Sequence, residues 1–134
     1  MPFDGMLVQE MVDKGVELLL GGTRDPTFGP VVVVGLGGTY TELVRDYTLA
    51  VAPVKIEEAK MMLGRGMLGR SISGYRGGPR VPVDRLAKVV SDFSRIMVEN
   101  PQIEQMEVNP LMATEGAILS VDARVLLRRD WDRP

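Results

Sequence analysis

The sequence predicts an α+β fold in which a mainly antiparallel sheet packs against two or three helices, within a single domain spanning residues 1–134. Short apolar runs typical of strands gather in both halves of the chain, and helical patterns lie between them. Strands in blocks favour a sheet covered on one face over a doubly wound sheet, because helices do not alternate regularly with strands. With 134 residues, 45% of them hydrophobic, the chain has the length and composition of one domain with a core.

The first half of the chain holds most of the expected strands. These strands are 6–12, 15–20, 31–34, 40–44 and 47–51. A short polar connection ending in Gly15 separates the first two, so we expect them to pair as a hairpin. The segment 23–30 is rich in Pro, Gly and Asp and predicts a loop, and Pro53 ends the last of these strands.

Two helices are expected in the middle of the chain. The segment 56–63 carries acidic residues in its first turn and is followed by Gly64, whereas the glycines from there to 78 predict a break in regular structure. The second helix shows apolar residues at helical spacing, with Asp84 as the expected N-cap and Asn100-Pro101 as its end. Its apolar stripe consists of Leu86, Val89, Val90, Phe93, Ile96 and Met97.

A strand, a hairpin and another strand are expected from 103 to 127, followed by a charged tail, 128–134, that we expect to fray. Alternate side chains of a strand share a face, so Glu107 and Asn109 point the same way, and a hairpin partner can bring Asp122 beside them. Carboxylate and amide oxygens are the ligands that magnesium takes together with phosphates and water. On residue type and spacing alone, a turn at Asn-Pro remains the alternative.

Two glycine-rich segments are candidates for anion contacts. Backbone N–H groups of 35–38, after a buried strand, are free to approach a phosphate, although neither a Walker nor a dinucleotide motif is complete. Arg76, on the loop 74–79, is a second candidate because a guanidinium grips pairs of oxygens. The alternatives are a turn that needs glycine and a flexible connection.

Composition excludes several classes of function. The chain has no Cys and no His, which excludes disulfides, thiolate metal sites, Ser-His dyads and His-zinc sites within it. A net charge of −2 from 18 acidic and 16 basic residues leaves no basic stripe for nucleic acid or a membrane surface. No apolar run approaches the roughly 20 residues of a membrane span, and no signal-peptide pattern opens the chain. We therefore expect a cytoplasmic protein with neither nucleic acid nor membrane as its partner.

Seven short motifs occur in one order along nearly the whole chain. They are Val8–Met11, Gly15–Leu18, Asp25–Pro30, Gly35–Gly38, Gly74–Gly77, Glu107–Leu111 and Val121–Arg124. Together they resemble the ATP-grasp region of ADP-forming acyl-CoA synthetases, such as the beta subunit of ADP-forming acetyl-CoA synthetase. The Glu-x-Asn-Pro-Leu and Asp-Ala motifs are also similar to those of the related succinyl-CoA synthetase beta subunit.

The resemblance implies the second, C-terminal subdomain of an ATP-grasp fold, with Mg²⁺ and ATP or ADP as cofactors. Asn109 and Asp122 would bind the magnesium that bridges the nucleotide phosphates, and Glu107 would act at the reacting phosphate. The main chain at Glu10 and Val12 would meet the adenine edge, and Glu17 would lie nearby. Positioning and charge neutralisation of this kind are what phosphoryl transfer requires.

The implied reaction converts an acyl-CoA, ADP and phosphate into the free acid, CoA and ATP through a phosphohistidine. The chain has no histidine, so the resemblance implies partners: a first ATP-grasp subdomain and CoA-binding domains that carry the phosphohistidine, in the same or a separate chain. We expect the chain alone to be inactive. The alternative is a non-catalytic regulatory or nucleotide-sensing domain, as in protein lysine acetyltransferases fused to such a region. The acyl substrate and the choice between ADP and GDP stay open.

Overall fold

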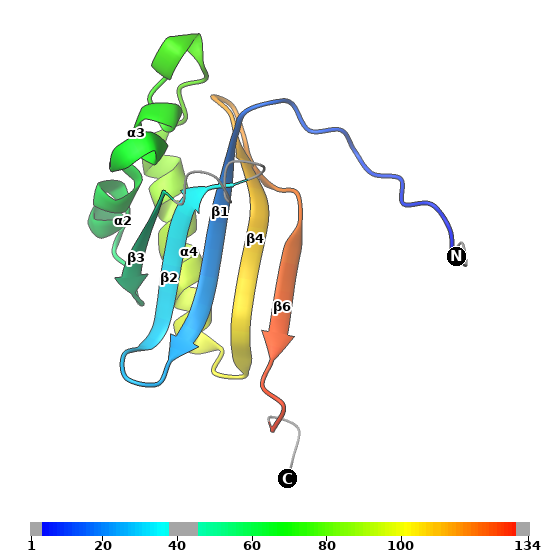
Figure 1. The fold of residues 1–134 in the computed structure, drawn as a ribbon, viewed down its shortest axis with the longest axis vertical. Coiled ribbons are helices and arrows are strands. Elements are labelled where there is room, and N and C mark those ends of the chain that lie inside the picture. The colour runs from blue at the N-terminus through cyan, green and yellow to red at the C-terminus, as the bar shows by residue number, and fades with distance from the viewer. Residues whose placement is uncertain (1–3, 38–45, 131–134) are drawn as a thin grey trace.

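The structure, a computed structural model, describes residues 4–37 and 46–130 (Figure 1). Within these ranges the chain forms a six-stranded sheet in which every strand pair is antiparallel. The strands are β1 (Val16–Asp25), β2 (Gly29–Leu36), β3 (Tyr47–Val51), β4 (Ile103–Ala113), β5 (Ile118–Ser120) and β6 (Ala123–Leu127). The helices are α2 (Ile56–Leu63), α3 (Gly66–Ile72), α4 (Val83–Glu99) and a 3-10 turn, η2 (Tyr75–Gly77). The expected α+β class is confirmed.

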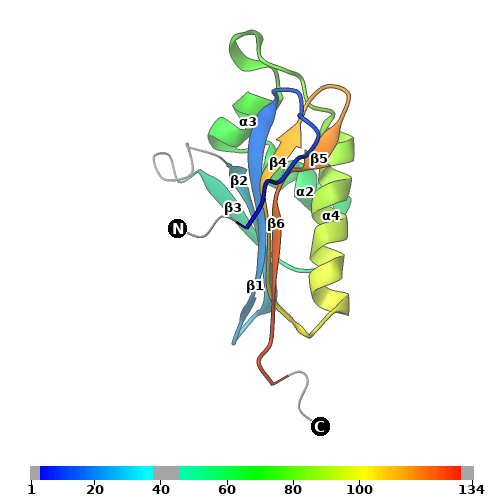
Figure 2. The same ribbon diagram turned by 90° about the vertical axis from the view of Figure 1, so that its right-hand side faces the viewer.

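The strand order is β3-β2-β1-β4-β5, and β6 pairs with β4 as well. The long connection between β3 and β4 contains all the helices of the described residues, and α2 and α4 lie on one side of the sheet (Figures 1 and 2). Strand β4 is therefore bonded to β1 along one edge and to β5 and β6 along the other. Glu107 and Asn109 of β4 therefore lie within the sheet and not on an edge strand.

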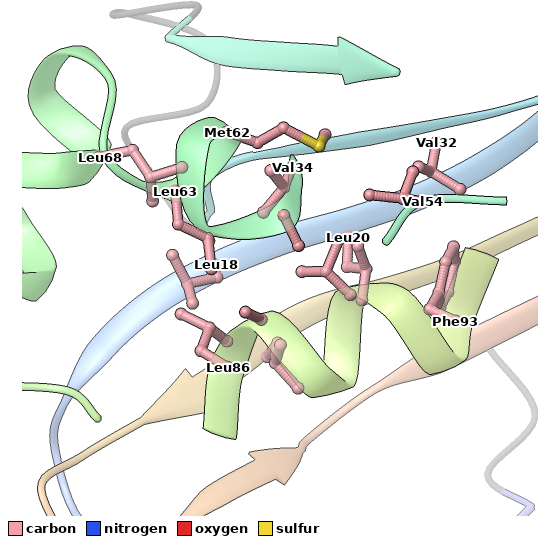
Figure 3. Packing of buried hydrophobic residues seen from close by; sticks show 14 of the residues in the cluster. Leu18, Leu20, Val32, Val34, Val54, Met62, Leu63, Leu68, Leu86 and Phe93 are labelled. Carbon is pink, nitrogen blue, oxygen red and sulfur yellow. The ribbon is translucent and has the colours of Figure 1, made fainter. Parts of the chain in front are cut away.

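The core lies between the sheet and the helices α2 and α4 (Figure 3). Alternate residues of β1, Leu18 and Leu20, are 0% and 1% exposed, and they pack toward α4 with Val32 and Val34 of β2. The amphipathic stripe of α4 supplies the other side, with Leu86 and Phe93 buried. Alternate residues of a strand share one face, and residues at helical spacing share one side of a helix. The apolar residues of β1 and β2 therefore face the apolar side of α4.

Two polar side chains tie α4 to its surroundings. The buried Ser94 hydroxyl accepts a hydrogen bond from the Val54 N–H at 2.9 Å and donates to the Ser91 carbonyl at 2.7 Å. Arg24, on β1, reaches the end of α4, where its guanidinium donates to the carbonyls of Met97 (2.6 Å), Asn100 (2.8 Å) and Ile103 (2.6 Å). Helix carbonyls that lack an intrahelical partner are thereby satisfied.

The expected hairpin between 6–12 and 15–20 is wrong. Residues 4–15 form neither helix nor strand, and the segment runs away from the sheet (Figure 1). The reason is that β1 already pairs on both edges, with β2 and with β4, so it offers no free edge to a preceding strand. The apolar side chains of this segment stay exposed, Leu7 by 88% and Met11 by 90%.

The loop predicted over 23–30 is only a tight turn. The Asp25 carboxylate accepts hydrogen bonds from the N–H groups of Thr27 at 2.8 Å and Phe28 at 3.0 Å, and Gly29 takes a φ of +80°. This Asx-type turn is compact enough for β1 and β2 to continue pairing up to its ends. The strand expected over 31–34 is confirmed as part of β2.

The glycine-rich stretch after α2 also departs from expectation, because it contains α3. A Cβ atom at Gly69 would lie 2.4 Å from the carbonyl oxygen of Gly64, so glycine here allows α3 to pack closely on the end of α2. Burial of Leu68 and Ile72 outweighs the weak helix propensity of glycine.

The helices α2 and α4 lie where the sequence places them, with one correction. Pro82, not Asp84, is the N-cap of α4, and Asp84 lies in the first turn, where its carboxylate pairs with Lys60 at 2.9 Å. The strand expected over 47–51 is confirmed as β3. The strand expected over 40–44 and residues 131–134 of the tail lie outside the described residues.

Candidate functional site

The predicted site residues on β4 share one side of the strand. The Asn109 Nδ2 atom donates to Glu107 Oε1 at 3.5 Å. Across the sheet, Glu107 lies opposite Gly21 of β1 and Arg124 of β6. The Glu107 carboxylate therefore has an amide donor on its own strand and a cationic residue as its neighbour on the next strand.

Backbone hydrogen bonds bring Asp122 next to Asn109. The Asn109 N–H donates to the Asp122 carbonyl at 3.0 Å, and the Val121 N–H donates to the Pro110 carbonyl at 3.1 Å. The Asp122 side chain is exposed. Within the described residues, neither its carboxylate nor Asn109 Oδ1 takes part in a hydrogen bond or ion pair. The Asp122 carboxylate and Asn109 Oδ1 are therefore oxygen atoms that can coordinate a cation.

The end of β2 closes this corner of the sheet from the other side. The Gly37 N–H donates to the Glu17 carbonyl at 2.8 Å. A Cβ atom at Gly37 would lie 3.0 Å from Asn109 Oδ1 and 2.8 Å from the Leu18 carbonyl oxygen. Gly37, directly after β2, thus lies against Asn109 of β4, a contact that the sequence does not reveal because it depends on the register of three strands.

A pocket of about 220 Å³ lies on the face of the sheet opposite the helices. Glu107 and Arg124 contribute its charged groups, and the apolar part comes mainly from β1, β2, β3 and β6 through Leu19, Val31, Val33, Leu49 and Leu126. Asn109 and Asp122 are not among its lining residues. Glu107 therefore connects an apolar hollow with the polar corner formed by Asn109 and Asp122.

The remaining predicted residues lie along β1 and the segment before it. Glu17 is exposed on β1, opposite Met112 of β4. Glu10 and Val12 lie in the N-terminal segment, where Glu10 is exposed and Val12 is half-buried. No hydrogen bond joins the main chain of either residue to the rest of the described structure. The structure gathers Glu107, Asn109 and Asp122, and it leaves Glu10 and Val12 on a separate segment.

The donor set fits magnesium carried by phosphates better than an all-protein cage. Among residues 4–37 and 46–130, no group of three or more His, Cys, Asp or Glu is arranged to hold a metal ion. Asn109 and Asp122 offer one amide oxygen and one carboxylate. Mg²⁺ usually keeps several waters and takes only one or two protein carboxylates when phosphate oxygens complete its octahedron.

The fold is an antiparallel sheet with helices on one side, and Asn109 and Asp122 offer their side-chain oxygens at and beside the central strand β4. Residues 1–127 match the family described as the ATP-grasp domain. The chain belongs to the ATP-grasp family.

Curated relatives place it more narrowly. It is 36% identical over 124 residues to acetate–CoA ligase [ADP-forming] I of Archaeoglobus fulgidus, a match covering 92% of this chain and 18% of that protein. It is 34% identical over 123 residues to the beta subunit of acetate–CoA ligase [ADP-forming] I of Pyrococcus furiosus, covering 92% of this chain and 53% of that subunit. The chain thus spans about half of the beta subunit and under a fifth of the longer protein.

Solved structures agree. The chain superposes on dinucleotide-forming acetyl-coenzyme A synthetase 1 of Ca. Korarchaeum cryptofilum, in complex with coenzyme A and Mg-AMPPCP, with a TM-score of 0.85 and 40% identity. The match covers 90% of this chain and 56% of that one. The expected ATP-grasp fold is confirmed.

The described residues contain no helix with the length and apolar character needed to cross a membrane.

Proposed function

We propose that this chain is the magnesium-nucleotide half-site of an ADP-forming acyl-CoA synthetase. The observation that carries the proposal is the corner in which a backbone hydrogen bond of 3.0 Å holds Asn109 beside Asp122, with Glu107 two residues away on the same side of β4. The relatives that share the fold and 34–40% of the sequence are ADP-forming acetate–CoA ligases and an acetyl-coenzyme A synthetase. In this proposal residues 1–134 form one unit, the second ATP-grasp subdomain.

Asn109 Oδ1 and the Asp122 carboxylate are the groups that would hold the magnesium. The ion, when bound with a nucleotide, neutralises phosphate charge. The hydrogen bond from Asn109 Nδ2 to Glu107 turns the amide so that Oδ1 is left for the cation. Gly37 keeps that oxygen uncovered, because a side chain there would lie against it.

Glu107 would stand at the reacting phosphate and orient the phosphohistidine that a partner domain brings. Its place at the border of the polar corner and the 220 Å³ pocket supports this role. When a partner covers it, the apolar pocket would exclude water and so strengthen electrostatic interactions at its rim. The main chain at Glu10 and Val12 would meet the adenine edge, with Glu17 nearby, once the N-terminal segment is enclosed by the first subdomain.

The missing partners follow from the chemistry. With no histidine, the chain cannot carry the phosphate itself. A first ATP-grasp subdomain would close over the nucleotide, and CoA-binding domains would deliver the phosphohistidine, either in the same chain or in another. The reaction would turn acyl-CoA, ADP and phosphate into acid, CoA and ATP, in the cytoplasm. Purified chain that catalysed this reaction unaided would contradict a half-site.

The sharpest test of the metal role is Asp122→Ala in the assembled enzyme. We expect the magnesium concentration for half-maximal activity to rise at least about tenfold, since one of two protein ligands is lost. Glu115→Ala, at the exposed turn between β4 and β5, is the control and should leave the magnesium dependence unchanged. Unchanged activity and magnesium dependence in Asp122→Ala would remove this residue from the site.

Glu107→Gln separates catalysis from binding. Glu104→Gln, also exposed on β4, is its matched control. We expect Glu107→Gln to lower kcat by about a hundredfold or more while magnesium-nucleotide binding persists. An assembled wild-type protein that binds magnesium nucleotide but shows no turnover would instead support the regulatory alternative.

A further inference from the structure

The segment 64–82 is the most cationic part of the chain. It contains four arginines, Arg65, Arg70, Arg76 and Arg80, and no acidic residue, although the whole chain carries a net charge of −2. All four side chains are exposed. A concentrated positive charge within an acidic protein attracts anions to that place.

Neighbouring acidic groups do not neutralise this segment. Asp84 and Glu57 pair with Lys60, at 2.9 Å and 3.4 Å. Asp46 accepts a hydrogen bond from the Leu68 N–H at 2.9 Å, so its carboxylate is used at the start of α3. Within the described residues none of the four arginines forms an ion pair.

The backbone of the loop after α3 holds an unusual conformation. Gly74, Arg76 and Gly77 have φ values of +87°, +54° and +75°, and Arg76 is the one residue other than glycine with positive φ in the described chain. L-residues rarely adopt this conformation, which places their side chains where an ordinary turn does not. Glycine would adopt this backbone conformation without strain. The presence of arginine instead therefore indicates that its side chain has a function.

Two arginines of the loop have defined positions. The Arg76 guanidinium lies 5.3 Å from the centre of the Tyr75 ring, a cation–π contact. Arg80 lies over Gly74, where a Cβ atom would meet its side chain at 2.8 Å from Cγ and 3.3 Å from Nε. The loop is closed at its base by a bridge between Ser73 and Arg80. Positioned guanidinium groups lose less freedom when they bind a ligand.

We propose that Arg76 and Arg80 form an anion site, on the loop 73–80, for a ligand that carries a diphosphate or several phosphates. Guanidinium groups bind phosphate oxygens bidentately, and two of them on one short loop match adjacent phosphates. The loop follows α3 at the upper end of the molecule in Figure 1, whereas the polar corner is formed by Asn109 of β4 and by Asp122, which directly precedes β6. The site therefore needs neither magnesium nor the proposed function of that corner.

Calorimetric titration of the complete chain with inorganic pyrophosphate, in EDTA and at low salt, tests the proposal. We expect Arg76→Gln and Arg80→Gln each to weaken binding about threefold to tenfold. The matched control is Arg95→Gln on α4, an exposed arginine already paired with Asp92 at 3.1 Å, and it should bind like the wild type. Added NaCl should weaken wild-type binding, because exposed charges are screened.

Arg76→Gly guards against misfolding, since glycine accepts the positive φ and removes only the charged side chain. It should fold as well as the wild type and still lose pyrophosphate affinity. Equal binding by the wild type and all loop variants would overturn the proposal. So would absence of binding in EDTA at millimolar pyrophosphate, or binding that needs magnesium and is abolished by Asp122→Ala.

Two sources of the diphosphate are separated by the same measurement. ADP and coenzyme A both carry a diphosphate, and coenzyme A has a further phosphate on its ribose. Tighter binding of coenzyme A than of 3′-dephospho-coenzyme A, lost in Arg80→Gln, would assign the site to the coenzyme. Equal affinity for ADP, coenzyme A and its dephospho form would assign it to the shared diphosphate alone.

Discussion

The two faces of the sheet differ sharply in how they are covered. On the helix side, Leu18, Val32 and Val34 are 0% exposed. On the opposite side the side chains are also apolar, but Leu49 is 61% exposed and Val51 is 49% exposed. Leu49 lines the pocket on this face, and exposed apolar side chains gathered on one face indicate a surface that a partner covers. The closed face holds the domain together, and the open face adjoins the polar corner, as expected of one wall of a two-part site.

The largest effect is expected when one leucine on each face of the sheet is replaced by alanine. Leu20→Ala on the closed face should lower the free energy of unfolding by about 2–5 kcal/mol, because it leaves a cavity in a packed core. Leu49→Ala on the open face should change it by less than about 1 kcal/mol. Urea denaturation of the chain measures both. Equal losses would mean that the open face contributes to the core.

Removing Arg24 tests the link between the sheet and the end of α4. Arg24→Met keeps the length of the side chain but leaves the carbonyls of Met97, Asn100 and Ile103 without this donor. We expect a loss of about 2–3 kcal/mol by the same denaturation. Arg95→Met, on the solvent side of α4, is the control and should cost under about 0.5 kcal/mol. A similar cost for both arginines would show that the three hydrogen bonds add nothing.

A smaller effect is expected at Ser94, the buried polar group of the closed face. Ser94→Ala removes the acceptor of the Val54 N–H and should destabilise the chain by about 1–2 kcal/mol. Ser73→Ala, at an exposed position, serves for comparison and should be near neutral. A neutral Ser94→Ala would mean that another group satisfies the Val54 N–H.

The smallest effect concerns pH and the outer surface of α4. The hydrogen bond from Lys88 Nζ at 2.6 Å, assisted by the charge of Arg95, lowers the pKa of Asp92. A carboxyl whose folded pKa is depressed stabilises the protein above its unfolded pKa of about 3.9, and this contribution is lost as pH falls through the folded pKa.

Asp92→Asn should therefore make the acid limb of the stability curve slightly less steep below about pH 4. Asp13→Asn, in the N-terminal segment, is the comparison. A curve for Asp92→Asn that overlays the wild type would contradict a stabilising role of this pair.

Elements with local signals could be predicted from the sequence. The helix 56–63 has acidic residues at its start and glycine after its end, and the structure gives the same bounds. The elements that failed depend on distant partners. The segment 6–12 has a strand-like composition, but the β1 edge it would need is taken by β4, nearly a hundred residues later in the chain. Similarly, α3 exists because Gly69 fits against Gly64, which no periodicity reveals.

The same division holds for the site. The alternation of Glu107 and Asn109 is local, and their shared side of the strand follows from it. Predicting that Asp122 lies beside Asn109 required only the assumption of a hairpin between the two strands. By contrast, the approach of Gly37 to Asn109 and the place of Arg124 opposite Glu107 arise from the pairing of β4 with strands on both sides. Such contacts are properties of the assembled sheet.

The pairing of β4 on both sides also has a kinetic consequence. Its amides between Ile103 and Ala113 are bonded to β1 along one edge and to β5 and β6 along the other, so they are released only when the sheet itself opens. Hydrogen exchange along this strand should be among the slowest in the chain, whereas residues 4–15 should exchange quickly. The paired sheet therefore holds Glu107 and Asn109 at a fixed spacing, so a ligand meets a surface that is already ordered.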